Sequence, residues 1–154
     1  MSERPFVPAD FPVPEGLAGE GFRLEPLRPR HSVADYAAWT SSVEHIRATP
    51  GFVGGRWPHE MSEADNLADL ERHAADFAAR RGFTYTVLDA DDEVVGCVYV
   101  YPPHEGEPGD AAVRSWVRAD RAGLDPVLHA AVSAWLERDW PFDDPRYAPR
   151  VSPS

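Results

Sequence analysis

The residues best suited to chemistry lie in one stretch of the sequence, from Val113 to Asp125. The pattern there indicates a strand, a turn that contains Gly123, and the start of a helix. The chain's one local concentration of positive charge falls in this stretch and consists of Arg114, Arg118 and Arg121. Such a turn often presents backbone N–H groups to a phosphate-bearing ligand. The stretch therefore predicts an anion site, although Arg side chains paired with nearby carboxylates would explain the same sequence.

Asp125 opposes that interpretation. Asp is a favoured helix cap and Pro is favoured at the first helical position, so Asp125-Pro126 predicts a helix start with Asp125 as its cap. A capping carboxylate would occupy the same amides that a bound anion needs. The three Arg could offset its charge, and the sequence leaves both possibilities open.

The overall charge limits the kinds of partner. The net charge is −11, all 15 basic residues are Arg, and no basic run is present. Nucleic-acid binding and docking on an anionic membrane need clustered positive charge, so neither is expected. No apolar run is long enough to cross a bilayer, and the N-terminus lacks the layout of a signal peptide.

Cysteine and histidine usage narrows the chemistry further. Cys97 is the single cysteine, which fits a reducing compartment and leads us to expect a cytoplasmic protein. It lies in an apolar strand, where a small buried hydrophobe is the expected role. The six His are scattered without the spacing of metal ligands, so we expect no metal site.

Hydrophobic periodicity predicts the elements that must position these residues. Strands are expected at 22–28, 83–88, 93–101, 111–118 and near 147–151. Helices are expected at 32–47, with a bend near Ser41, and at 62–82 and 126–139. The order β-α-α-β-β-β-α-β predicts an α/β (α+β) fold, in which helices cover both faces of a mostly antiparallel central sheet.

Local signals refine these boundaries. Ser32 and Ser62 are each expected to cap a helix, and Gly82 is expected to end the second helix. Val33 is placed on the apolar face of the first helix. Gly96, inside an apolar strand, predicts a bulge or a close packing contact.

Two regions are expected along the chain. Residues 1–21 are rich in Pro and should be extended, either lying on the domain or forming a disordered tail. Residues 22–151 are expected to form a single domain.

This order of elements resembles the GNAT superfamily of acyl-CoA-dependent N-acyltransferases. Three segments carry the resemblance, namely Phe22–His31 as the opening strand, Asp92–Val100 as the third strand, and Trp116–Leu124 as the fourth strand with its cofactor turn. The family's turn has Gln or Arg, two residues, then Gly-x-Gly or Gly-x-Ala. Here Arg121 and Gly123 match, but Asp125 replaces the last small residue. The family's fourth helix and last two strands have no counterpart after Val151.

The resemblance implies that acetyl-CoA, or another acyl-CoA, is the cosubstrate and that an amine attacks it directly. The implied cofactor-binding residues are Trp116, Val117, Arg118, Arg121, Ala122, Gly123, Leu124 and Asp125. A backbone N–H near Val117 would polarise the thioester carbonyl. Glu44 or His45, in the loop that the acceptor passes, would be the base. Tyr99 would be the acid, with Tyr101 and Tyr147 as alternatives.

Two other functions remain open at this stage. The chain could be a catalytically inactive GNAT-fold module for binding or dimerisation, since a sheet that ends early leaves an edge that a homodimer could cover. It could also be an unrelated α+β domain whose Arg and Trp residues hold an acidic small molecule. In the enzyme interpretation the acceptor is a small-molecule or protein amine, and the acidic surface favours a cationic one.

Overall fold

A computed structural model describes residues 5–150 of the protein. Its sheet has six strands in the order β1-β2-β3-β4-β5-β6, and all neighbours are antiparallel except β5 and β6, which are parallel. The strands are β1 (Leu17–Gly19), β2 (Phe22–Pro26), β3 (Phe83–Asp89), β4 (Val94–Tyr101), β5 (Ala111–Val117) and β6 (Pro145–Tyr147). The mixed, mostly antiparallel sheet confirms the predicted fold class, and β1 is an addition to the predicted order.

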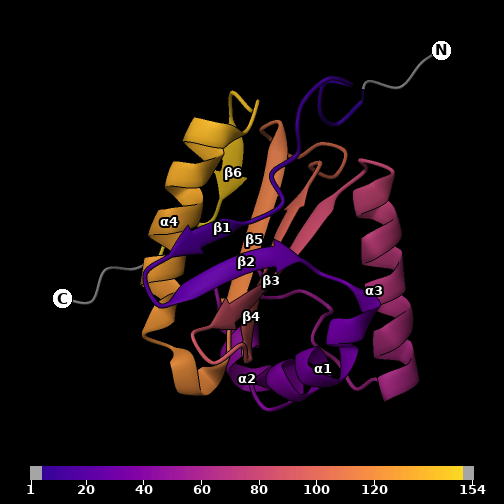
Figure 1. The fold of residues 1–154 in the computed structure, drawn as a ribbon, viewed down its shortest axis with the longest axis vertical. Coiled ribbons are helices and arrows are strands. Elements are labelled where there is room, and N and C mark those ends of the chain that lie inside the picture. The colour runs from indigo at the N-terminus through magenta and orange to yellow at the C-terminus, as the bar shows by residue number, and fades with distance from the viewer. Residues whose placement is uncertain (1–4, 151–154) are drawn as a thin grey trace.

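Helices cover both faces of this sheet (Figure 1). The helices are α1 (Ser32–Thr40), α2 (Val43–Arg47), α3 (Glu63–Ala78) and α4 (Leu124–Asp139), with 3-10 turns at Pro29–His31 and Ala119–Arg121. Apolar residues of α1, α2 and α3 pack with Cys97, Tyr99 and Trp116 on one face of the sheet. Those of α4 pack on the other face with Val98 and Val117. Within residues 5–150, no helix is long and apolar enough to cross a membrane.

The central strand β4 explains how one sheet serves two cores. Val98 and Val100 face α4, whereas Cys97 and Tyr99 face α1–α3, as strand alternation requires. The register shifts opposite Val87 and Leu88, so that β4 carries an extra residue next to Gly96. A Cβ at Gly96 would lie 2.4 Å from the Trp116 carbonyl oxygen. Both alternatives predicted for Gly96, a bulge and a close contact, are therefore present.

The first helix differs from its prediction. The 3-10 turn at Pro29–His31 runs directly into α1, so His31 takes the cap position and Ser32 is already helical. The predicted apolar face is wrong at Val33, which is 77% exposed. Asp35 is instead buried, together with Ala38 and Trp39 one turn further along. A carboxylate thus lies on the packed face of α1.

The second predicted helix is correct at its start and wrong at its end. The Ser62 side chain accepts a hydrogen bond from the Asp65 amide at 3.1 Å, which confirms the predicted cap. Arg80, and not Gly82, takes the left-handed backbone conformation after α3, with φ of 61°. A side chain at Gly82 would overlap the Tyr101 ring, so packing rather than backbone freedom explains this glycine.

Both ends of the described chain pack on the domain. Val7 is buried in the α4-side core, and Phe6 and Phe11 pack against it, so the described part of the Pro-rich arm lies on the domain. The predicted last strand forms as β6, which ends at Tyr147, and Val151 lies outside the described residues.

Candidate functional site

A cavity of about 770 Å³ lies between α1, α3, the 51–59 loop and the adjoining strands β4 and β5. This volume is in the range of small-molecule sites. Phe52, Trp57, Tyr99 and Tyr101 supply aromatic walls, and Leu27 and Leu70 add apolar surface. The ionisable side chains that reach into this mainly apolar space are the first candidates for chemistry.

Asp35 enters the cavity from α1. Its carboxylate is only 5% exposed, and Oδ2 accepts a hydrogen bond from Asn66 Nδ2 of α3 at 3.3 Å. Asn66 is itself fixed, because its Oδ1 accepts from Trp39 Nε1 at 3.0 Å. Burial raises the pKa of Asp35 to about 6, which the Asn66 hydrogen bond partly opposes. Asp35 is therefore mostly ionised above neutral pH but titrates close to it.

His73 enters from α3 and is neutral at pH 7. Burial lowers its pKa to about 4. Its Nδ1 lies 2.8 Å from the Tyr101 hydroxyl, which in turn donates to Asp76 Oδ2 at 3.0 Å. The Thr84 hydroxyl lies 3.1 Å from the same Nδ1. These partners hold the imidazole in one orientation, and one ring nitrogen of its neutral form carries a lone pair that can accept a proton.

Arg114 enters from β5 and supplies positive charge. Its guanidinium carbon lies 5.0 Å from the Phe52 ring centroid and 5.4 Å from that of Tyr99. Both distances are in the range of cation–π contacts. Asp35 raises the pKa of the Cys97 thiol and Arg114 lowers it, although burial is the main cause of its rise. The two charges therefore act on the same part of the sheet.

The predicted anion turn lies at the opposite end of β5. The helix α4 begins at Leu124, one residue before the expected cap, and no side chain caps its first turn. Gly123 precedes it, and a Cβ there would meet no atom within 4 Å. Backbone amides of this turn therefore have room for a phosphate, as the pyrophosphate of acyl-CoA requires. The turn fits this group.

Asp125 does not cap the helix, which corrects the sequence prediction. Its Oδ2 accepts from Arg150 Nε at 2.7 Å. Arg150 also donates to the Ser115 carbonyl at 3.0 Å, and the Ser115 hydroxyl hydrogen-bonds that of Tyr147. Competition between Asp125 and a ligand for the α4 amides is thus removed. The Arg150 side chain instead covers the edge of β5 at Ser115.

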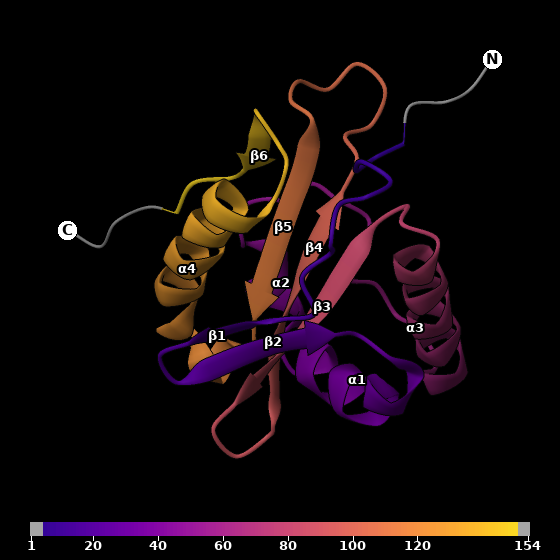
Figure 2. The same ribbon diagram turned by 45° about the horizontal axis from the view of Figure 1, so that its top comes forward.

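Beyond Val113, no strand pairs with that edge of β5, which is called the open edge below. The pairing of β5 with β6 covers only Ala111 to Val113 on β5 (Figure 2). The Arg118 amide donates to Val95 on β4, whereas the Ser115 carbonyl faces Arg150 on the opposite side. Backbone groups of alternate strand residues point the same way, so the Val117 N–H faces the open edge with Ser115. This places it where the sequence analysis expected a polarising amide.

The structure brings some predicted site residues together and separates others. Tyr99 lines the cavity, and its hydroxyl accepts from Trp116 Nε1 at 3.0 Å. Glu44 and His45 lie on α2 and are not among the residues that line the cavity. Their predicted roles, like that of Tyr99, stay predictions.

Two of the predicted cofactor-binding residues around the turn have partners within the chain. Arg118 Nε pairs with Asp120 at 2.9 Å, and Arg121 pairs with Asp89 at 3.0 Å. These ion pairs agree with the alternative explanation of the Arg cluster, in which the Arg side chains pair with nearby carboxylates. The backbone amides of the turn are then the groups that an anion could contact. Ala122, Gly123 and Leu124 supply that backbone.

Three cavity residues were missed in the sequence. Asp35 had a detectable signal, since it shares a helical face with Trp39 and Ala38 at spacings of three and four. His73 likewise follows Leu70 on α3 by three residues. Arg114 was noticed, but for the anion turn rather than for the cavity. The cavity thus depends on residues whose local sequence patterns look structural.

Comparison with known proteins supports the fold. No protein-family model matches the sequence, and neither does any curated protein. The structure is similar to the ribosomal-protein-S5-alanine acetyltransferase from Vibrio fischeri, with a TM-score of 0.60, 12% identity, and 79% of this chain and 66% of that chain covered. It is also similar to RimJ from Mycobacterium smegmatis in complex with CoA-disulfide, with a TM-score of 0.55, 19% identity, and 79% and 63% covered.

A third similar structure is the microcin C7 self-immunity acetyltransferase MccE in complex with acetyl-CoA and AMP. Its TM-score is 0.59 at 12% identity, with 81% of this chain and 66% of that chain covered. The chain has the fold of the GNAT acetyltransferases, and the predicted resemblance is confirmed at the level of the fold. It spans about two thirds of the length of the structures that it matches.

Proposed function

We propose that this protein transfers an acyl group from acyl-CoA to the amine of an acceptor bound in the aromatic cavity. The observation that carries the proposal is the arrangement of β5. Its side chains at Arg114 and Trp116 face the α1–α3 side of the sheet. Its other backbone edge, which no strand pairs beyond Val113 and which the Arg150 side chain covers at Ser115, leads to the uncapped start of α4. One strand thus borders both the acceptor cavity and the edge along which a cosubstrate would extend.

The chain's own groups would then divide the work as follows. Amides of Gly123 and Leu124 would hold the pyrophosphate, and the Val117 N–H would polarise the carbonyl. Acyl-CoA would supply the activated acyl carbon as a thioester. The amine nitrogen forms a bond to that carbon, the C–S bond breaks, and the sulfur leaves as a thiolate.

Two proton transfers complete the reaction. The ammonium form of the acceptor must lose a proton before attack, and Asp35 and His73 are the cavity groups that can accept one at neutral pH. The nitrogen loses a second proton after attack, and the Tyr99 hydroxyl would relay this proton to the departing thiolate. Burial raises the pKa of this hydroxyl well above its usual value, so it is protonated before the reaction. Glu44 and His45 are alternative bases only if the loop around α2 moves toward the acceptor.

Thermal unfolding with acetyl-CoA tests the cosubstrate. A ligand at a hundred times its dissociation constant stabilises a protein by about 2.7 kcal/mol, so we expect a rise in Tm. Gly123→Asp places a carboxylate in front of the α4 amides and should abolish the rise without lowering the Tm of the free protein. The matched control Ala130→Asp adds the same charge to an exposed site later in α4 and should keep the rise. No rise in the unmodified protein at millimolar acetyl-CoA would refute the proposal.

The proposal also covers the acceptor, the cellular compartment and the oligomeric state. The similar structures include a ribosomal-protein acetyltransferase and a microcin immunity acetyltransferase, so protein and small-molecule amines are both candidate acceptors. We expect action in a reducing cytoplasm, because the single cysteine, Cys97, is a free buried thiol. A homodimer that covers the β6 edge is a further prediction, and sedimentation would test it.

A further inference from the structure

The charged side chains that line the cavity differ in whether the chain supplies them with a partner. Asp69 accepts from Arg72 at 3.2 Å, and Glu107 accepts from a backbone amide of the β4–β5 loop at 2.9 Å. Asp35 and Arg114 have no ion-pair partner anywhere in residues 5–150. One carboxylate and one guanidinium therefore face the same space with their charges unneutralised by the protein.

Arg114 is held in a way that leaves its donors available. Its planar group lies over the rings of Phe52 and Tyr99, and its stem packs beside Gly51. These contacts use none of its N–H groups as hydrogen-bond donors, and these groups donate to no group of the described chain. A guanidinium oriented in this way suits a carboxylate, which accepts two parallel hydrogen bonds.

Asp35 favours a cationic ligand group, whereas Arg114 favours an anionic one. Oδ2 accepts one hydrogen bond from a neutral amide, and Oδ1 accepts none from the described residues. A buried carboxylate with one neutral partner is unfavourable unless a cation joins it. The ammonium group of an amine meets this need, and the same group is what an acyl acceptor brings to the site.

One part of the cavity wall is aromatic. Phe52 and Trp57 lie with ring centroids 5.9 Å apart, and Trp57 and Trp39 lie 5.5 Å apart. Trp57 is only partly buried, so part of its surface is left for a ligand. The wall therefore favours a ligand with an aromatic or large apolar body.

We propose that the cavity binds a free amino acid with an aromatic or large apolar side chain. Its ammonium would meet Asp35, its carboxylate would meet Arg114, and its side chain would lie against Phe52 and Trp57. Its role as acyl acceptor depends on the proposed function, but its binding does not. Polyamines lack a carboxylate that could pair with Arg114, and the Arg114 guanidinium would repel their additional positive charges.

Matched ligand pairs test the carboxylate preference. Binding is measured by calorimetry for L-phenylalanine, L-tryptophan and L-leucine, each against its decarboxylated amine, namely phenethylamine, tryptamine and isoamylamine. Each titration is run with the protein alone and with saturating CoA. We expect each amino acid to bind at least about tenfold more tightly than its amine, which is the effect of one charge-assisted contact.

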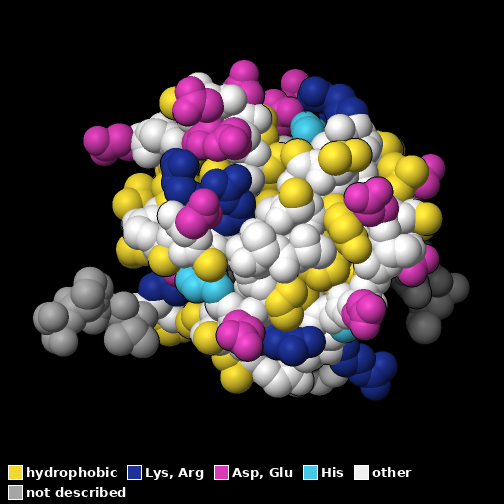
Figure 3. Space-filling view, turned by 90° about the horizontal axis from the view of Figure 1, so that it is seen from below, with side chains coloured by type: hydrophobic (Ala, Val, Ile, Leu, Met, Phe, Trp, Pro, Cys, Tyr) yellow, Lys and Arg dark blue, Asp and Glu magenta, His cyan; other side chains and the backbone are white. Residues whose placement is uncertain are grey.

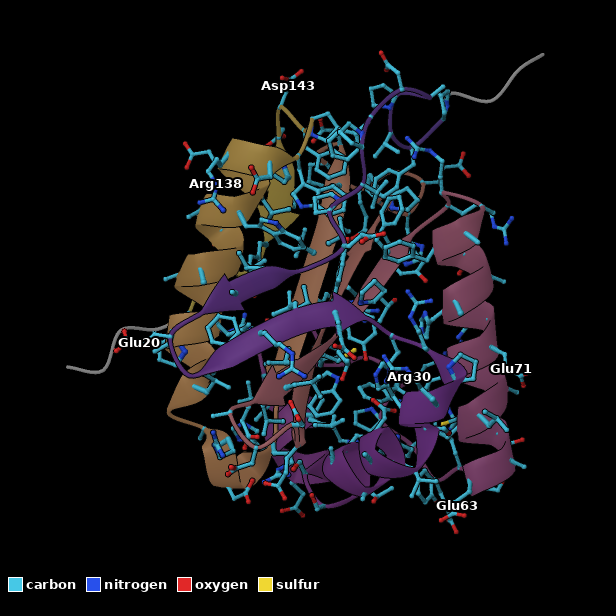
Figure 4. The ribbon with its side chains drawn as sticks, in the orientation of Figure 1. Glu20, Arg30, Glu63, Glu71, Arg138 and Asp143 are labelled. Atoms are coloured by element: carbon cyan, nitrogen blue, oxygen red, sulfur yellow. The ribbon has the colours of Figure 1, made fainter. Side chains whose placement is uncertain are left out.

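Variants assign that preference to particular side chains. Arg114→Gln should reduce the difference within each pair to less than about threefold, whereas Asp35→Asn should weaken both members. Arg138→Gln is the matched control, because it makes the same charge change on α4, where Arg138 is exposed and far from the cavity (Figure 4). Circular dichroism checks that each variant is folded, and the ligand pairs on the unmodified protein need no variant.

The outcomes separate this inference from the proposed function. Equal binding within the pairs, or no binding of any member, overturns the amino-acid proposal. Arg114-dependent binding without release of CoA from acetyl-CoA supports the ligand class and rejects acyl transfer to it. Release of CoA with phenethylamine but not with L-phenylalanine supports transfer and rejects the ligand class.

Discussion

The two sides of β5 handle charge in opposite ways. On the open edge, Arg150 is 8% exposed and binds Asp125 and the Ser115 carbonyl, so that its donors are used within the fold. On the cavity side, Asp35 and Arg114 lie in one space without ion-pair partners in the described chain. A paired buried charge is costly to disrupt, whereas an unpaired one lowers stability and stays available to a ligand. The contrast supports the proposal that a ligand meets side-chain charge in the cavity and not at the Arg-rich turn.

The face of the molecule that Figure 3 shows gives no comparable signal. Acidic and basic side chains are interspersed among hydrophobic ones on the face that Figure 3 shows. On α3, Glu63 and Glu71 point away from the sheet (Figure 4). Asn66, Leu70 and His73 of the same helix line the cavity. The informative charges are therefore the few that α1, α3 and β5 present to the cavity, where Asp35 is buried and Arg114 is exposed.

The largest effect on stability is expected from removing the ion pair between Arg150 and Asp125. Arg150→Ala leaves Asp125 and the Ser115 carbonyl without their donor, and we expect a loss of about 3 kcal/mol in the free energy of unfolding. Urea denaturation measures it. The matched control Arg146→Ala removes an exposed ion pair with Asp144 and should cost less than about 1 kcal/mol. Similar losses for the two variants would contradict the idea that the open edge is stabilised by a buried pair.

Removing the charge of Asp35 from the cavity should raise the free energy of unfolding, whereas removing Arg150 should lower it. The raised pKa of Asp35 means that the folded protein binds a proton more tightly than the unfolded chain. Stability therefore falls as pH rises from about 4 to about 6. Asp35→Asn removes this effect, and we expect a gain of up to about 3 kcal/mol at pH 8, from 1.36 kcal/mol per pKa unit, with loss of acyl transfer. A loss of stability at pH 8 would show that Asp35 is structural.

His73 should show a smaller effect with the reverse pH dependence. Its folded pKa of about 4 lies below the usual 6.5, so the unfolded chain binds the proton more tightly between these values. The native protein is then destabilised as pH falls below about 6.5. His73→Gln should reduce the stability difference between pH 8 and pH 5 by about 2 kcal/mol. An unchanged difference in paired urea titrations would argue against a buried neutral imidazole.

Much of the framework could be predicted from local patterns. The hairpin of β3 and β4, the Ser62 cap, and the strand–turn–helix of β5 and α4 depend on residues close together in sequence. Alternation and capping are decided by short-range geometry, so such elements can be recognised in a single chain. Errors arose where a neighbour in space changed the outcome. The 3-10 turn displaced the cap from Ser32, and the Tyr101 ring accounts for Gly82.

The order of the elements from β2 to β6, the acidic, Lys-free composition, and the glycine-containing turn before α4 could be read from the sequence. Which charges are neutralised depends on the tertiary structure. Arg150 reaches Asp125 across 25 residues, and Asn66 reaches Asp35 across 31. Such partners are chosen by packing between α1, α3, β5 and the segment after β6, and no short-range pattern encodes them. For that reason the turn was visible in the sequence, whereas the cavity with Asp35, His73 and Arg114 appeared only in the folded chain.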